Sequence, residues 1–206
     1  MKFYEETVLP WAINRVMAKK EFAVEREKFV PLATGQVLEI GMGSGFNIPF
    51  YSPNVERLFG LESSETLKQH ASKKAKIAQF PVEFVGLTGE EIPLDDHSIN
   101  TVVSTWTMCT IPDMPKALAE IRRILKPDGK LIFVEHGRSP DRSIRFIQNT
   151  LNPVWKRVGG GCNLNRPIDD LIQQAGFQIG KGENSYMDGV NPLGFLFRGM
   201  AQKAQL

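Results

Sequence analysis

A glycine-rich turn that follows an acidic residue is the part of this chain best suited to chemistry. Residues 37–47 read VLEIGMGSGFN, in which Glu39 precedes glycines at alternate positions, Gly41, Gly43 and Gly45. Because glycine has no Cβ, such a turn lets backbone approach a ligand closely, and the apolar run before it is typical of a buried parallel strand. The carboxylate of Glu39 could face a cationic amino group of that ligand.

The spacing of these glycines separates the turn from two well-known phosphate-binding loops. A dinucleotide-binding loop has another glycine three residues after the second one, where this chain has Phe46. A P-loop has Lys and then Ser or Thr after its last glycine, and that pair is absent. The turn therefore predicts a nucleoside-like ligand without a pyrophosphate, and Phe46 disfavours a nicotinamide dehydrogenase.

One histidine and two cysteines are further side chains that could react. His136 follows an apolar run, and its imidazole could act as a general base near neutral pH, or could bond to loop backbone and orient a cap. His70 and His97 stand among charged and polar residues, so we expect them in solvent. Cys109 and Cys162 would suit a metal or an arsenical, but without a CxxC spacing we predict packing thiols and no metal site.

Strand-like and helix-like stretches alternate along most of the chain, which indicates an α/β sheet with helices on both faces. Strands are expected at 37–40, 57–61, 82–85, 99–104 and 130–135. Helices are expected at 65–78, at 112–125 and at 167–176. Two last stretches, 177–180 and 194–202, are expected to form a closing hairpin. Ligands bind at the carboxyl ends of the strands in such sheets, which is where the glycine turn lies.

Two segments lie outside the alternation, and we interpret both as caps on a single domain that spans 1–206. Residues 1–32 form an amphipathic helical lead-in. Residues 139–166 carry apolar side chains at helical spacing, which could belong to the core or to a substrate surface. This second segment leaves the carboxyl end of a strand, which favours a place over the site.

Composition limits the classes of function. The chain has 206 residues, 42% of them hydrophobic, which is enough for one sizeable core. Its 25 basic and 23 acidic residues give a net charge of +2 and show no basic face, so we expect no nucleic-acid partner. Two cysteines cannot build a disulfide framework, and neither a signal peptide nor a transmembrane run is visible. We expect a soluble, cytoplasmic protein.

Four pieces of the chain, in order, resemble the class I S-adenosylmethionine-dependent methyltransferases. They are the turn 39–45, the acid Glu62 at the end of the second strand, the stretch TGEEIPL at 88–94 and the stretch ILKPDGKL at 124–131. The resemblance implies a doubly wound, Rossmann-like, seven-stranded sheet in which the closing hairpin makes one strand antiparallel. It also implies that the cofactor is S-adenosylmethionine.

The resemblance assigns cofactor contacts to a set of residues around that sheet edge. The set is Glu39, Gly41, Gly43, Gly45, Asn47, Glu62, Ser63, Thr88, Gly89, Glu90, Thr105 and Trp106. Glu62 matches the acid that binds both ribose hydroxyls. Many members have an aspartate where this chain has Thr88, so we expect adenine contact there through backbone and a hydroxyl instead of a carboxylate.

A narrower resemblance concerns the acceptor. The stretches WTMC at 106–109, EHG at 135–137 and GGCNL at 160–164 are similar to a type-11 methyltransferase group, itself similar to mammalian membrane-associated alkyl-thiol methyltransferases. This resemblance implies methyl transfer to a small apolar acceptor, and we expect a thiol. The alternatives are N-methylation of a phospholipid such as phosphatidylethanolamine during peripheral membrane contact, and a regulatory module that binds the cofactor without turnover.

Two side chains have expected roles in that reaction. The sulfonium of the cofactor is an activated electrophile, so the protein's main task is to place the nucleophile in line and exclude water. An acceptor thiol has an ordinary pKa of about 8.5, so His136 could assist by removing its proton. Trp106 could shape the acceptor pocket or contact the sulfonium by a cation–π interaction, or it could pack against a helix.

Overall fold

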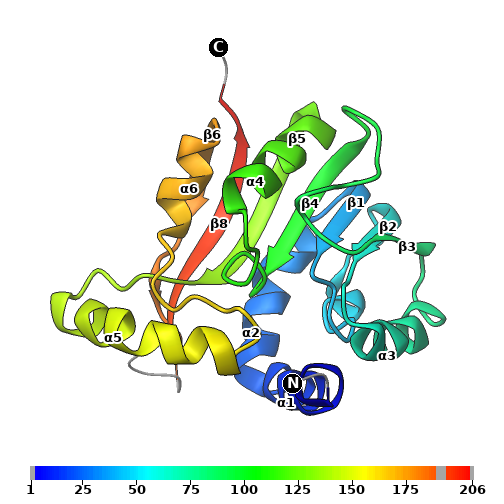
Figure 1. Ribbon diagram of the computed structural model, residues 1–206. Coiled ribbons are helices and arrows are strands. Elements are labelled where there is room, and N and C mark those ends of the chain that lie inside the picture. The colour runs from blue at the N-terminus through cyan, green and yellow to red at the C-terminus, as the bar shows by residue number, and fades with distance from the viewer. Residues whose placement is uncertain (1–2, 189–193, 205–206) are drawn as a thin grey trace.

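A central sheet with helices on both faces makes up the protein, as the alternating pattern predicts (Figure 1). The computed structural model describes residues 3–188 and 194–204. The strands are β1 (Gly35–Ile40), β2 (Val55–Leu61), β3 (Val82–Gly86), β4 (Ile99–Thr105), β5 (Leu125–His136), β6 (Phe177–Gly182), β7 (Ser185–Tyr186) and β8 (Phe195–Lys203). They pair in the order β3-β2-β1-β4-β5-β8-β6, and the two-residue β7 pairs with β8 outside that path.

The closing hairpin reverses the direction of one strand. β8 is antiparallel to both β5 and β6, whereas β3, β2, β1, β4 and β5 are mutually parallel. The predicted seven-stranded, mostly parallel sheet with an antiparallel closing strand is therefore confirmed, with β7 as a small addition. The carboxyl ends of the parallel strands lie at the edge of the sheet around which α1, α3 and α5 are arranged (Figure 1).

Helices cover the sheet on both sides because successive strand residues point to opposite faces. The helices are α1 (Leu9–Met17), α2 (Lys20–Phe29), α3 (Glu65–Ala75), α4 (Met114–Ile124), α5 (Arg142–Val158) and α6 (Ile168–Gln174), with short turns η1 (Tyr4–Val8), η2 (Val30–Leu32) and η3 (Ile48–Phe50). Leu38 and Phe133 pack under α4 and α6. Their neighbours Val37 and Ile132 pack on the other face, against η2 and α3.

Two elements begin at other residues than the sequence pattern predicts. The side chain of Asp113 accepts from the backbone N of Lys116 at 3.1 Å, so α4 begins after Asp113 and not at 112. β5 begins at Leu125, earlier than expected, because the strand absorbs the Pro-Asp-Gly turn as an irregularity in its pairing with β4. These shifts leave His136 at the end of β5, at the expected edge.

The N-terminal helices are attached to the sheet by a buried ion pair. Glu25 of α2 lies 2.8 Å from Nε of Arg198 on β8, and both side chains are almost fully buried. The buried charges are matched across the contact, which is the condition under which such a pair is tolerated. Residues 1–2 of the predicted N-terminal cap lie outside the described residues.

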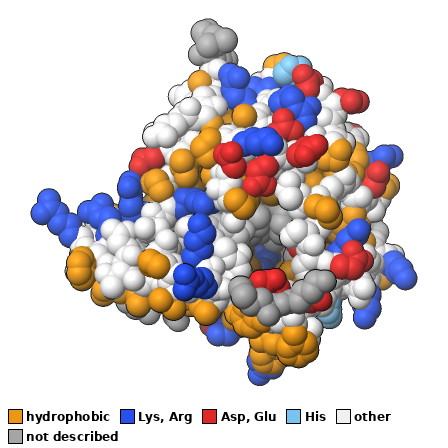
Figure 2. Space-filling view, in the orientation of Figure 1, with side chains coloured by type: hydrophobic (Ala, Val, Ile, Leu, Met, Phe, Trp, Pro, Cys, Tyr) orange, Lys and Arg blue, Asp and Glu red, His pale blue; other side chains and the backbone are white. Residues whose placement is uncertain are grey.

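Most of the apolar stripe of α5 is exposed to solvent. The buried residue of this helix is Gln148, whose side chain accepts from the backbone N of Ser139 at 2.9 Å and donates to the carbonyl of Gly137 at 3.0 Å. Phe146 and Val154 are 73% and 66% exposed. Hydrophobic side chains gather along the lower edge of the molecule, around α1 and α5 (Figure 2). Within the described residues, no helix is both long and apolar enough to span a bilayer.

Candidate functional site

A cavity of about 1290 Å³ opens at the carboxyl edge of the parallel strands. Ligand pockets commonly measure roughly 300–1,000 Å³, so this cavity has room for a cofactor and an acceptor together. The residues assigned to the cofactor by resemblance line its wall, except for Gly45. They are Glu39, Gly41, Gly43, Asn47, Glu62, Ser63, Thr88, Gly89, Glu90, Thr105 and Trp106, with His136 in the same wall.

The three glycines of the turn have left-handed backbone angles but different surroundings. A Cβ on Gly41 would meet Oγ1 of Thr107 at 2.3 Å, and a Cβ on Gly45 would meet the backbone of Ala71 on α3 at 3.1 Å. A Cβ on Gly43 would meet nothing closer than 3.9 Å, so it would point into open space. Gly43 is therefore the glycine that keeps the cavity clear, while Gly45 lets the turn pack against α3.

Glu39 is a buried carboxylate at the base of the cavity. It accepts hydrogen bonds from Tyr51 Oη at 2.8 Å and from Asn47 Nδ2 at 2.9 Å, and it is 1% exposed. Burial raises its pKa to about 8, while the bond from Tyr51 and the charge of Arg26 act in the opposite direction. A cationic group of a ligand placed against Glu39 would therefore favour its ionised form.

Arg26 on α2 lines the cavity, although no sequence motif indicates it. Its Nε donates to Oδ1 of Asn47 at 3.0 Å, and its guanidinium lies 5.3 Å from the ring centre of Phe46 and 5.2 Å from that of Trp106. Burial lowers its pKa to about 10, so it remains charged at neutral pH. The one available signal was that Arg26 follows the apolar Phe22 by four residues and so shares its helix face.

Glu62 holds the glycine turn from the end of β2. One carboxylate oxygen accepts from the backbone N of Gly43 and the other from that of Ser64, both at 2.7 Å. Burial raises the pKa of Glu62, although the backbone donors partly oppose it. A carboxylate has about four acceptor positions, so Glu62 can also accept from a hydroxyl group of a ligand.

Trp106 has an unusual backbone at the end of β4. Its φ is 52°, which is rare for a bulky residue and points to a functional constraint. Its ring lines the cavity and also packs edge-on against Phe22 of α2, with ring centres 4.9 Å apart. Trp106 therefore combines two of the arrangements expected for it, a pocket wall and a helix contact.

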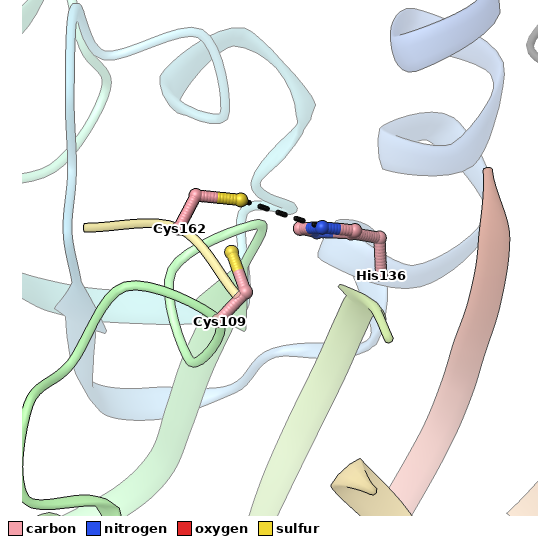
Figure 3. A group of neighbouring side chains, drawn as sticks. All are labelled: Cys109, His136 and Cys162. Atoms are coloured by element: carbon pink, nitrogen blue, oxygen red, sulfur yellow. Dashed lines mark hydrogen bonds between the residues drawn. The ribbon is translucent and has the colours of Figure 1, made fainter. Parts of the chain in front are cut away.

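Cys109, His136 and Cys162 come together in the same wall (Figure 3). Sγ of Cys162 lies 3.4 Å from Nε2 of His136, and the ligand atoms of all three residues lie within 4.8 Å of one another. The neighbouring Cys109 thiol and His136 imidazole lower the pKa of Cys162 to about 4, while the pKa of Cys109 is raised. Sequence spacing did not reveal this cluster, because three separate segments supply its members. His70 and His97 are exposed, as expected.

The known proteins that this chain resembles are methyltransferases. The methyltransferase domain family Methyltransf_11 matches residues 38–133. Thiol S-methyltransferase TMT1B of Homo sapiens is 35% identical over 181 residues, which is 84% of this chain and 74% of that protein. A phosphatidylethanolamine N-methyltransferase of Cereibacter sphaeroides is 29% identical over 126 residues, 57% of this chain and 62% of that one.

A solved structure shares the fold at low sequence identity. It is the Haemonchus contortus protein named phospholethanolamine N-methyltransferase 2, in complex with phosphomonomethylethanolamine and S-adenosylhomocysteine. The TM-score is 0.69 at 16% identity, and the match covers 99% of this chain and 60% of that chain.

Proposed function

The chain belongs to the class I S-adenosylmethionine-dependent methyltransferases of the type-11 group, and on that premise we propose that it methylates a small apolar thiol. Its cofactor is S-adenosylmethionine, which supplies an activated methyl group on a sulfonium when bound. The observation that carries the thiol acceptor is the cluster of Cys109, His136 and Cys162, a thiol-rich and basic corner of the cofactor cavity. The similarity to the human thiol S-methyltransferase supports the same acceptor.

The cofactor-binding part of the proposal follows the cavity wall. Glu39 receives the ammonium group, Glu62 receives the ribose hydroxyls, and the 88–90 loop borders the adenine. The buried carboxylate of Glu39 and the open space beside Gly43 both suit such a ligand. Asn47, Ser63, Thr105 and the remaining glycines shape the wall around it.

The proposed chemistry is an in-line displacement. The acceptor sulfur attacks the methyl carbon, a C–S bond forms, and the bond from that methyl to the cofactor sulfur breaks with its electron pair. The acceptor's proton passes to the cluster, where the hydrogen-bonded pair of Cys162 and His136 is the base. Closure of segments 1–32 and 139–166 over the cavity excludes water. Tyr4 Oη donates to the carbonyl of Val158 at 2.5 Å and so joins these two predicted caps.

The direct test is a methyl-transfer assay with labelled S-adenosylmethionine and a panel of alkyl thiols, amines and phosphatidylethanolamine vesicles. We expect label in thioether products and none in amines of the same size. Transfer only to amines or lipid would overturn the thiol proposal. Tight S-adenosylhomocysteine binding with no transfer to any acceptor would favour the regulatory module.

Phospholipid N-methylation is the second candidate because the apolar side chains of α1 and α5 are exposed beside the cavity. Trp11 and Phe146 are 63% and 73% exposed, and a lipid surface could cover them. Vesicle flotation tests whether the protein binds such a surface. If the protein stays off phosphatidylethanolamine vesicles and still turns over thiols in their absence, the lipid candidate fails.

A further inference from the structure

We propose that Cys109, His136 and Cys162 bind one Zn²⁺ ion in the wall of the cavity and leave a coordination position for the acceptor thiol. This inference rests on the proposed thiol function and deepens it. It names the centre that would hold the acceptor sulfur and remove its proton. The donor set of two cysteines and one histidine, with a fourth position open, is one that catalytic zinc sites use.

The positions of the three side chains suit a small ion. Zn–S bonds of about 2.3 Å and Zn–N bonds of about 2.0 Å place the ligand atoms of a tetrahedral site with two sulfurs and one nitrogen roughly 3.5–3.8 Å apart. Sγ of Cys162 and Nε2 of His136 are already 3.4 Å apart, and all three ligand atoms lie within 4.8 Å. The side chains converge from three different directions (Figure 3), so small rotations would close the set around one ion.

The two cysteine-bearing loops are held in place by bonds that do not involve the sulfur atoms. Backbone N and Nδ2 of Asn163 both donate to the carbonyl oxygen of Cys109, each at 2.9 Å. Arg166 donates to the carbonyl oxygens of Met108 and Ile111, the latter at 2.7 Å. The separation of Cys109 and Cys162 is therefore set by the fold, which is the preorganisation a metal site needs.

Groups around the ligands support the same reading. Nε1 of Trp155 donates to Sγ of Cys162 at 3.2 Å, and bonds of this kind orient metal ligands. In residues 3–188 and 194–204, these three residues are the one group of this type found within ligand distance.

The location gives the ion a function. The cluster shares its cavity with Trp106, beside which the sulfonium and its methyl group are expected. A thiol that coordinates zinc loses its proton. The proton leaves to water, the bound sulfur forms the new C–S bond, and the cofactor sulfur keeps the electron pair of the bond that breaks. The neutral thioether is a weaker ligand of zinc than the thiolate, so the product can dissociate from the ion. When zinc is bound, His136 is a metal ligand and not a base.

Metal binding is tested first, without reference to activity. The full chain is stripped with a chelator and titrated with Cd²⁺, whose thiolate complexes absorb in the near ultraviolet. We expect one equivalent per chain, displaced by Zn²⁺. Cys162→Ser and His136→Ala should lower the affinity at least tenfold, with His97→Ala as the matched histidine control. Cys109→Ala is the second cysteine variant, and unchanged S-adenosylhomocysteine binding shows that each variant is folded.

Activity then separates this inference from the proposed function. The stripped protein should bind S-adenosylhomocysteine as before but methylate thiols at least tenfold more slowly, and Zn²⁺ should restore the rate. Full thiol turnover in the stripped protein, or a Cd²⁺ band that survives both cysteine variants, would overturn the metal site. One equivalent of bound Cd²⁺ with no thiol turnover in either state would leave the metal site standing and remove the thiol function.

Discussion

Nε of Arg26 donates to Oδ1 of Asn47 at 3.0 Å, and this bond joins the N-terminal helix α2 to the glycine turn. Nδ2 of Asn47 in turn donates to Glu39 at 2.9 Å and to Oγ1 of Thr105 at 3.0 Å. All four residues are buried. The orientation of Asn47, and through it of Glu39, therefore depends on a side chain outside the glycine motif.

Arg26→Met should weaken cofactor binding while leaving the helix in place. Methionine keeps the apolar stem but removes the donor to Asn47. A hydrogen bond from a charged group is worth about 1.5–3 kcal/mol, so we expect a roughly ten- to hundredfold loss of S-adenosylhomocysteine affinity by calorimetry. Lys28→Met, an exposed change on the same helix, is the control and should change nothing. Equal affinity of the two variants would remove Arg26 from the site.

Glu62→Gln should also lower cofactor affinity about ten- to hundredfold, because a neutral amide replaces the charged acceptor. The side chain keeps its size, so its effect on folding should be smaller than its effect on binding. The measurement is S-adenosylhomocysteine binding next to thermal unfolding. Glu56→Gln, an exposed change on the preceding strand β2, is the matched control. Normal binding by a folded Glu62→Gln protein would contradict the proposed ribose contact.

Gly43→Ala and Gly41→Ala should separate binding from folding. Both positions have positive φ, which costs a residue with a Cβ about 1–2 kcal/mol. Only at Gly41 does the new Cβ also collide with Thr107, at 2.3 Å. We expect Gly43→Ala to lose cofactor affinity with a modest fall in unfolding temperature, and Gly41→Ala to lower that temperature further. Equal unfolding temperatures for the two variants would contradict this assignment.

Much of the fold could be predicted because its signals are local. The apolar run before the glycine turn became β1, and the Ile99 stretch became β4, within a residue or two of the expected bounds. The orientation of α5 could not be predicted in this way. Periodicity shows that a helix has an apolar stripe but not which way it faces, and here the buried side chain is the polar Gln148.

The part of the site that could be predicted from the sequence is the part whose residues lie in one continuous segment. Glu39 and Gly43 lie in one motif, and both line the cavity. Arg26 could not be found, and the sequence named Cys109, His136 and Cys162 without showing that they lie together. Both features depend on packing between segments that are distant in the sequence. Cys162 is 26 residues from His136, and the loop bonds that bring them together have no sequence signature.

Glu39 should make folding stability depend on pH. Its pKa rises from 4.5 to about 8 on folding, so between these values the folded chain keeps a proton that the unfolded chain has lost. This contribution to stability is full below about pH 4.5 and disappears as pH rises through about 8. At about 1.4 kcal/mol per pKa unit, the whole effect is of the order of a few kcal/mol.

Glu39→Gln should remove most of that dependence, because the amide has no charge to bury. The wild-type unfolding temperature should fall between about pH 6 and about pH 9 by more than that of the variant. The control is Glu91→Gln, an exposed position that should follow the wild type. Cofactor binding should show the complementary effect, since an ammonium group against Glu39 favours ionisation. At about pH 6.5, wild-type binding should release a proton, seen by calorimetry in buffers of different ionisation enthalpy, and Glu39→Gln should not. Identical pH profiles for wild type and variant would mean that Glu39 stays ionised in its buried position.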